Sequence, residues 1–205
     1  RSIEKYLAGR LSKNICVSSG IVNYYESLGH SNTMLVPNGI DPSRVQYIAR
    51  RPLDKEIHFL FVGKLVNWQG IKEFAQWLNQ GSSKYRVALT VIGEGLVKPA
   101  LEDLKENVGY ELNLIGWSAW EEISEVSKVA DVAVIPRIDT SIKGSPLKLM
   151  DYICLNLPTW STYIDGVNDI DGMDKLVFFF DFEKSLDANI TNWLSKIDTE
   201  EVEKQ

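Results

Sequence analysis

Short apolar runs alternate along most of the chain with segments in which apolar residues recur at every third or fourth position. The runs have the length of buried strands, and the recurring pattern is typical of helices with one apolar face. Strands are expected at 57–62, 87–92, 112–115, 132–135, 176–180 and, as a shorter one, 159–161. Helices are expected at about 71–79, 97–107, 119–129, 145–155 and from residue 183 into the C-terminus.

Strands that alternate with helices indicate βαβ units, and strands that are apolar throughout indicate a sheet covered on both faces. We therefore expect an α/β fold class, a doubly wound, mainly parallel, six-stranded Rossmann-like sheet. Ligands of such sheets bind beyond the carboxyl ends of the strands. The turns that directly follow a strand are thus the places to look for chemistry.

The first part of the chain has a pattern of its own. Two helix–strand pairs precede the turn residues Pro37-Asn38-Gly39-Ile40-Asp41. The first is a helix at 1–13 with a strand at 14–19, and the second is a helix at 21–28 with a strand at 33–36. Proline, asparagine and glycine are residues that interrupt regular structure. We expect a boundary here, with 37–205 as the main domain.

Composition narrows the possible classes of protein. The 205 residues are 44% hydrophobic and 24% charged, which is typical of a soluble globular domain with a sizeable core. The net charge of -6 argues against a general nucleic-acid binder, which needs a basic face. Cys16 and Cys154 have neither the number nor the spacing of a disulfide framework or a zinc site, so a reducing cytoplasm fits best. Because the chain begins with Arg1, we expect a piece of a longer protein.

The stretch from Lys143 to Tyr152 is the strongest candidate for chemistry. Ser145 suits a helix N-cap, the following proline suits the first helical position, and Gly144 would let the backbone approach a ligand closely. A helix that starts this way favours a phosphate at its open end, with Lys148 one turn away. Asp151 lies on the same helical face and could accept hydrogen bonds from sugar hydroxyls. Together these residues predict a nucleotide-sugar site.

Three motifs, in this order, carry a resemblance to a known family. They are Pro-Asn-Gly-Ile-Asp at 37–41, the Gly63-Lys64 turn after an expected strand, and Ser-Pro-Leu-Lys-Leu-Met-Asp-Tyr at 145–152. The chain resembles the C-terminal donor-binding domain of GT-B-type retaining glycosyltransferases of the group 1 or family 4 kind. The resemblance extends over nearly the whole chain.

The resemblance implies roles for particular residues. Asp151 takes the place of the family's ribose-binding acid, and Lys143 takes the place of an acid near the donor sugar. Lys64 takes the place of an arginine and Gln69 that of a lysine, two cations that hold the donor diphosphate. Lys64 and Lys148 are the expected catalytic charges. The expected donor-binding residues are Gly63, Lys64, Trp117, Arg137, Lys143, Gly144, Ser145, Leu147, Lys148 and Asp151.

Two of these residues have an alternative role. Trp117 could stack on the nucleotide base or pack against Trp120, and most tryptophans serve in packing. Arg137 could reach a phosphate or the base, or it could be a solvated side chain before a loop.

The resemblance also implies a reaction and partners. The reaction is a transfer of a sugar, with retention, from a nucleoside diphosphate sugar to an acceptor, in glycan biosynthesis. It needs no cofactor and no bound metal. The first 36 residues would be the remnant of an N-terminal acceptor domain, which in this family carries the catalytic histidine, so the isolated fragment is expected to be inactive. We expect a cytoplasmic protein that binds no nucleic acid, with peripheral association at the inner face of a membrane as an option through the missing part.

Other functions stay open. The departures from the family pattern at Lys143 and Gln69 would also suit a nucleotide-sugar-binding or interaction module without catalysis. An NAD-dependent oxidoreductase is disfavoured, because Gly93-Glu94-Gly95 lacks the third glycine of the dinucleotide fingerprint. The acidic loop that holds Asp165 and Asp169 lacks the spacing of a calcium loop, and we expect it to be solvated.

Overall fold

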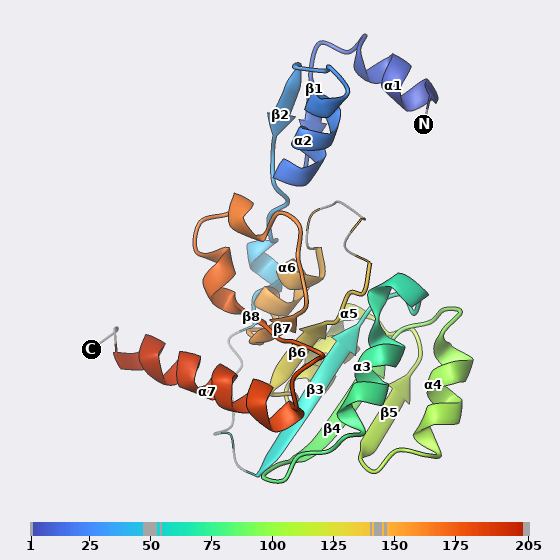
Figure 1. The fold of residues 1–205 in the computed structure, drawn as a ribbon, viewed down its shortest axis with the longest axis vertical. Helices are drawn as coiled ribbons and strands as arrows, with labels where there is room; N and C mark the ends of the chain where they lie inside the picture. The colour runs from blue at the N-terminus through green and yellow to red at the C-terminus, as the bar shows by residue number, and fades with distance from the viewer. Residues whose placement is uncertain are drawn as a thin grey trace.

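The computed structural model describes residues 2–46, 53, 55–139, 141, 145 and 147–202. These residues form a small N-terminal unit and a larger α/β unit, which are joined by a linker (Figure 1).

The larger unit is built on a six-stranded parallel sheet with the strand order β5-β4-β3-β6-β7-β8. Its strands are β3 (Glu56–Val62), β4 (Arg86–Ile92), β5 (Glu111–Ile115), β6 (Val132–Ile135), β7 (Thr159–Ser161) and β8 (Val177–Phe179). The chain runs outward from β3 to one edge and then returns to continue from β6 to the other edge. The predicted doubly wound α/β fold is therefore confirmed, and its switch point lies between β3 and β6.

Helices cover both faces of the sheet. The first face carries α3 (Ile71–Leu78), α4 (Lys98–Lys105) and α7 (Leu186–Val202), and the second carries α5 (Trp120–Ser127) and α6 (Leu147–Cys154). Side chains along β3 alternate accordingly. Phe59 and Phe61 join the core under α3, whereas Leu60 joins the core under α6.

Aromatic packing fixes the last part of the chain against the sheet. Trp160, on β7, is fully buried and packs edge-on against Phe59 and Trp193, with ring centroids 5.3 and 5.6 Å apart. It lies nearly parallel to Phe180 at 5.9 Å. Buried aromatic pairs of this kind add about 0.5–1.5 kcal/mol each beyond their area. Helix α7 is thereby tied to the central strand.

Helix α6 is held at the switch point by one buried phenol. The hydroxyl of Tyr152 accepts a hydrogen bond from the Val62 amide at 2.9 Å and donates one to the Val134 carbonyl at 3.3 Å. It thus bridges β3 and β6 at the place where their pairing ends. These two hydrogen bonds fix the position of α6 relative to the carboxyl edge of the sheet.

The small unit consists of α1 (Ser2–Ala8), β1 (Asn14–Cys16), α2 (Ser19–Ser27) and β2 (Thr33–Leu35), with β1 and β2 parallel. The linker that follows contains the short 3₁₀ helix η1 (Pro42–Arg44). Further 3₁₀ turns are η2 (Asn67–Gln69), η3 (Val167–Asp169) and η4 (Met173–Leu176). Cys16 and Cys154 are free and buried.

The acidic loop contacts the small unit through Asp165 and Asp169, so the expectation of a solvated loop is wrong for these two residues, whereas Asp171 is exposed. Asp165 is only 5% exposed and accepts a hydrogen bond from the Ser18 hydroxyl at 2.8 Å. Asp169 accepts one from the Ser19 amide at 2.6 Å. A Cβ atom at Gly20 would collide with the Asp165 carboxylate. The loop therefore binds the amino end of α2, where unpaired amides favour negative charge.

Within the described part of the chain, no helix has both the length and the apolar character needed to cross a bilayer.

Candidate functional site

Three glycine turns interlock at the carboxyl edge of the sheet. The Gly63 amide donates to the Ile92 carbonyl at 2.9 Å, and the Gly93 amide donates to the Gly116 carbonyl at 3.1 Å. A Cβ atom at Gly93 would collide with the Gly63 carbonyl oxygen. The turns after β3, β4 and β5 are therefore in close contact, and the Gly93-Glu94-Gly95 turn serves strand packing.

A cavity of about 280 Å³ lies beside these turns, between η2, the end of β6 and the start of α6. It brings together four residues that the sequence predicted for one site, Arg137, Ser145, Leu147 and Lys148. Its remaining lining residues are Trp68, Gln69, Ile135 and Ile164. The place agrees with the rule that ligands bind at the switch point of such a sheet.

The Lys148 ammonium is the most unusual group in this cavity. Its Nζ atom is buried and has no hydrogen-bond partner in the described part of the chain. It lies 3.9 Å from the centroid of the Phe61 ring. Burial lowers the pKa of Lys148 to about 7, with Asp151 opposing the shift and Arg137 adding to it. A buried, unpaired ammonium is costly in a folded protein, and an anion would satisfy it.

Among the described residues, Ser145 makes no capping hydrogen bond with its side chain. Its hydroxyl is buried without a hydrogen-bond partner among the described residues, while its carbonyl accepts a hydrogen bond from the Leu147 amide at 2.9 Å. Helix α6 begins at Leu147, whose side chain is exposed. A hydroxyl and an ammonium that have no hydrogen-bond partner in the part of the chain that the structure describes therefore line the same cavity. The predicted residues Lys143 and Gly144 lie outside the described residues.

Arg137 is half-buried and does not extend freely into solvent. Its Nη2 atom donates to the Asp139 carbonyl at 3.3 Å, and its Cζ atom lies 5.3 Å from the centroid of the Trp68 ring. Burial lowers the pKa of Arg137, and the nearby Asp165 opposes this. The guanidinium thus adds a second positive charge to the cavity.

Lys64 and Gln69 lie in different positions relative to the cavity. Lys64 is exposed on the turn after β3 and does not line the cavity, whereas Gln69 is only 6% exposed and does. The backbone is tight here, because a Cβ atom at Gly70 would collide with the Pro136 carbonyl oxygen. The cavity wall near η2 is therefore polar but uncharged.

Asp151 forms an ion pair that the sequence did not reveal. Its Oδ1 atom lies 3.2 Å from Nη2 of Arg44, on η1 of the linker. Burial raises the pKa of Asp151, and Arg44 opposes the shift. Arg44 follows the Pro-Asn-Gly-Ile-Asp motif by three residues, but a single arginine in a turn is not a motif.

Trp117 is exposed to solvent, whereas the Trp120 ring is covered by Arg44. Trp117 follows β5 and is 79% exposed, so packing in the core does not account for it. Trp120 starts α5 and lies under Arg44, whose Cζ atom is 3.7 Å from the centroid of its ring. An exposed indole at a strand end is available for stacking.

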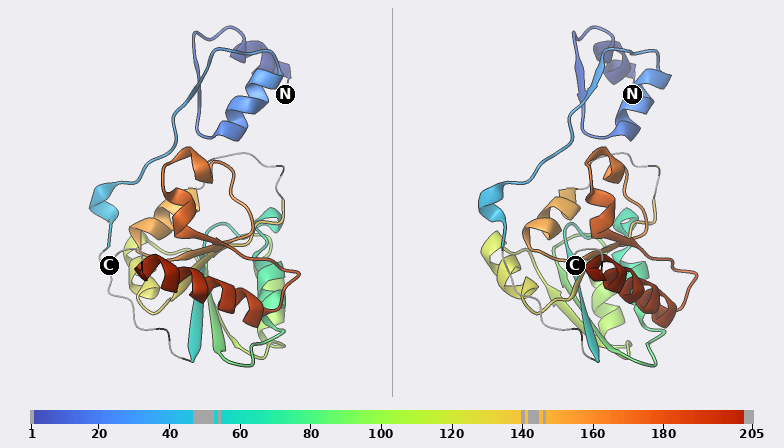
Figure 2. Two further views of the ribbon diagram at one scale, coloured as in Figure 1. Left: turned by 60° about the vertical axis from the view of Figure 1, so that its left-hand side comes forward. Right: turned by 90° about the vertical axis from the view of Figure 1, so that its left-hand side faces the viewer.

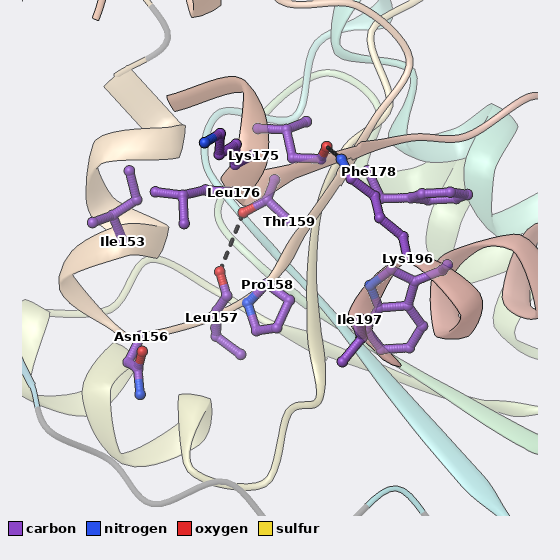
Figure 3. A pocket seen from close by; sticks show the side chains of 12 residues that line it. Ile153, Asn156, Leu157, Pro158, Thr159, Lys175, Leu176, Phe178, Lys196 and Ile197 are labelled. Atoms are coloured by element: carbon purple, nitrogen blue, oxygen red, sulfur yellow. Dashed lines mark hydrogen bonds between the residues drawn. The ribbon is translucent and has the colours of Figure 1, made fainter. Parts of the chain in front are cut away.

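A larger cavity, of about 340 Å³, lies away from this edge (Figure 3). It is mainly apolar and sits where β7 and β8 begin, against α7. The Lys196 ammonium at its wall donates to the Val177 carbonyl at 3.2 Å. Because ligands of a doubly wound sheet bind at the other ends of the strands, we do not assign the nucleotide to this cavity.

The comparisons with known proteins concern the family and the fold. Residues 56–196 match the family model described as "Glycosyl transferases group 1". No curated protein sequence matches the chain.

Solved structures share the fold at low sequence identity. The sucrose-phosphate synthase from Thermosynechococcus elongatus is 17% identical with a TM-score of 0.73, and the alignment covers 95% of this chain and 52% of that one. HepE from Anabaena, in complex with UDP, is 16% identical with a TM-score of 0.69, over 97% and 58% of the two chains. The lipopolysaccharide outer core galactosyltransferase WaaB is 20% identical with a TM-score of 0.63, over 77% and 45%. The chain thus spans about half the length of these proteins.

Proposed function

Because the chain belongs to the group 1 glycosyl transferases, we propose that the carboxyl edge of its sheet binds the nucleoside diphosphate sugar donor of a glycosyltransferase. The buried ammonium of Lys148 carries this proposal. It lies at the switch point and has no hydrogen-bond partner among the described residues. A diphosphate would supply the missing negative charge and the hydrogen-bond acceptors. The structure of HepE with UDP, a protein of the same fold, supports a ligand of this class.

Each predicted residue has a role in this proposal. Lys148, with the Ser145 hydroxyl and Arg137, binds the diphosphate inside the cavity. Lys64 approaches it from the solvent side, while Gly63 leaves room for the ammonium of Lys148. Asp151 accepts hydrogen bonds from the ribose hydroxyls, and Trp117 stacks on the base. Leu147, at the start of α6, is a further proposed donor-binding residue. Lys143 and Gly144 are proposed as donor-binding residues from the sequence motif alone.

The chemical contribution of this domain is the stabilisation of a leaving group. When the bond from the sugar to the diphosphate breaks, negative charge grows on the diphosphate, and fixed positive charges lower the energy of that state. Lys148 and Lys64 are the proposed sources of this charge, so neither a metal nor a cofactor is needed. Transfer with retention is part of the proposal.

The remaining part of the proposed active site would come from an acceptor domain of the whole protein. We propose that residues 1–36 are the end of an acceptor domain and that residues 37–205 are the donor domain. The acceptor-domain histidine would then be supplied by the preceding domain, and the isolated chain would bind donor without transferring sugar. We also propose that the whole protein works in the cytoplasm, with association at the inner face of a membrane as an option.

A second candidate is a nucleotide-sugar-binding module without catalysis. Gln69 favours it, because this uncharged side chain stands in the cavity wall where the resembled family has a lysine. Sugar transfer by the full-length protein would decide between the two. Both candidates share the same donor site.

The shared site can be tested by calorimetric titration of the chain with UDP, GDP and ADP, each beside its nucleoside. At least one diphosphate is expected to bind more tightly than its nucleoside, because the ammonium of Lys148 recognises the phosphates. NAD serves as the comparison ligand. Binding of NAD with no binding of any nucleoside diphosphate would contradict the proposed function.

A further inference from the structure

The linker between the two units is fixed in place beside α6. The Asp41 carboxylate accepts hydrogen bonds from the amide and hydroxyl of Ser43, at 2.9 and 2.7 Å, and so closes the η1 turn. Two residues beyond η1, the Gln46 amide donates to the Cys154 carbonyl at 2.6 Å. Figure 2 shows this light-blue turn next to α6 from two sides. The linker thus presents Arg44 in a defined direction.

The Arg44 guanidinium makes two contacts of different kinds. Its Nη2 atom pairs with the Asp151 carboxylate at 3.2 Å, and its Cζ atom lies over the Trp120 ring, 3.7 Å from the ring centroid. A cavity of about 190 Å³ opens beside these three side chains, with Val62 and Tyr152 in its wall. The contacts therefore lie next to the end of β3, on the side of α6 where the ribose acid is predicted.

A guanidinium and a nucleoside offer the same features to such a surface. Both present a flat polar group that can stack on an indole, and both present hydrogen-bond donors that a carboxylate accepts. In Arg44 these are the guanidinium plane and its N–H groups. In a nucleoside they are the base, which would lie with one face on Trp120 and leave its other face for Trp117, and the ribose hydroxyls.

We propose that Arg44 occupies the nucleoside half of the donor site and that a bound nucleotide displaces it from Asp151 and Trp120. This inference rests on the proposed function. It makes Arg44 a residue that sets nucleotide affinity, and it makes a movement of the Arg44 side chain away from Asp151 and Trp120 a consequence of donor binding.

The exposure of the pair makes this displacement feasible. The side chains of Arg44 and Asp151 are 40% and 43% exposed, so solvent screens their attraction. Together with the stacking, such contacts correspond to about a three- to thirtyfold effect on a competing equilibrium. A nucleotide that binds both groups and the phosphate cavity can exceed this.

The test is a titration of UDP and of pyrophosphate into wild type and Arg44→Ala. Arg44→Ala is expected to bind UDP about three- to thirtyfold more tightly, with pyrophosphate affinity unchanged, because the phosphate cavity does not include Arg44. Arg10→Ala is the matched control. Arg10 also lies over an aromatic ring, that of Tyr6 at 4.1 Å, but in the small unit. Its removal is expected to leave both affinities unchanged.

A second comparison tests whether Arg44 acts through Asp151. In the Asp151→Asn background, removal of Arg44 is expected to raise UDP affinity by a smaller factor than in wild type, because only the stacking contact remains to be displaced. Equal factors in the two backgrounds would overturn the inference. Arg44→Lys keeps a charge for Asp151 but no flat group for Trp120, and its UDP affinity is expected between those of wild type and Arg44→Ala.

The outcomes separate this inference from the proposed function. Weaker or unchanged UDP binding by Arg44→Ala, with wild type binding UDP, would overturn the displacement of Arg44 alone. Loss of pyrophosphate binding together with UDP binding would make Arg44 a phosphate ligand and would also overturn it. If neither protein bound any nucleoside diphosphate, the proposed function would fail, and this inference with it.

Discussion

The Nζ atom of Lys148 occupies the space that a Cβ atom at position 63 would need. Gly63 has a φ of 147°, a conformation that residues with a side chain rarely adopt, and it directly follows the last residue of β3. A side chain at this turn would therefore be strained by its backbone conformation and would force the Lys148 ammonium to move.

Gly63→Ala should consequently disturb both the turn and the cavity. We expect the free energy of unfolding to fall by about 1–3 kcal/mol, because the added methyl group is strained and displaces Lys148. Urea denaturation of the variant measures this. Gly39→Ala is the matched control, since a Cβ atom at Gly39 has no neighbour within 4 Å. A loss at position 63 no larger than that at position 39 would refute the steric argument.

The depressed pKa of Lys148 predicts a pH-dependent stability. Burial lowers this pKa from 10.5 to about 7, so between these values the unfolded chain binds more protons at this residue than the folded protein does. Stability due to Lys148 therefore rises with pH across this window and is lowest below pH 7. In Lys148→Met this contribution is absent.

The measurement is the free energy of unfolding of both proteins at pH 7 and pH 9. The difference between Lys148→Met and wild type is expected to shrink by about 2–3 kcal/mol over this interval, with the variant favoured at the lower pH. Lys105→Met, at an exposed position on α4, should show no such trend. A constant difference for Lys148→Met would mean that its ammonium titrates normally.

The fold could be predicted from the sequence because its strands are short and almost uniformly apolar. The strands predicted at 132–135 and 159–161 have these bounds in the structure, and the other strands of the six-stranded sheet differ from their predicted bounds by one residue at one or both ends. The expected strand at 14–19 ends at Cys16, because Ser18 caps α2.

The site could be predicted only in part, because its decisive contacts join distant segments. The cluster of Arg137, Ser145, Leu147 and Lys148 follows from their places at the ends of β6 and the start of α6. The pairing of Arg44 with Asp151 joins the linker to α6, and no local pattern encodes it. The pattern of polar and apolar residues in the sequence likewise did not indicate that Asp165 would be buried against α2.

The contact between the two units predicts that removal of the small Ser18 side chain lowers the stability of the protein considerably. Ser18 caps α2, accepting from the Ile21 amide, and also donates to the buried Asp165. Ser18→Ala removes both bonds and leaves the carboxylate with one donor fewer. We expect a loss of about 1–3 kcal/mol in the free energy of unfolding.

Ser27→Ala is the control for this change. Ser27 lies at the other end of α2, is exposed, and donates only to the Tyr24 carbonyl among the contacts described. Its substitution should change stability by less than about 0.5 kcal/mol. Equal losses at both serines would mean that the bond to Asp165 contributes nothing.

Lys148 and Lys64, the two proposed sources of positive charge for the phosphates, differ in how exposed they are. Lys148→Ala and Lys64→Ala should each weaken the binding of a nucleoside diphosphate by about 1.5–3 kcal/mol, with Lys64 at the low end because it is exposed. Binding of the bare nucleoside should change much less. Calorimetric titration of each variant with UDP and uridine provides the comparison, and equal losses for both ligands would refute the assignment.

The central claim, that α6 binds a nucleotide with Asp151 on its ribose, is tested most directly by titrating wild type and Asp151→Asn with UDP and with its 2′,3′-dideoxy analogue. Wild type should prefer the ribose by about 1–3 kcal/mol, because a carboxylate accepts hydrogen bonds from both hydroxyls. Asp151→Asn should lose this preference, with stability nearly unchanged because the ion pair to Arg44 is half-exposed. Equal binding of the two ligands by wild type, or an equal loss for both on substitution, would contradict the account.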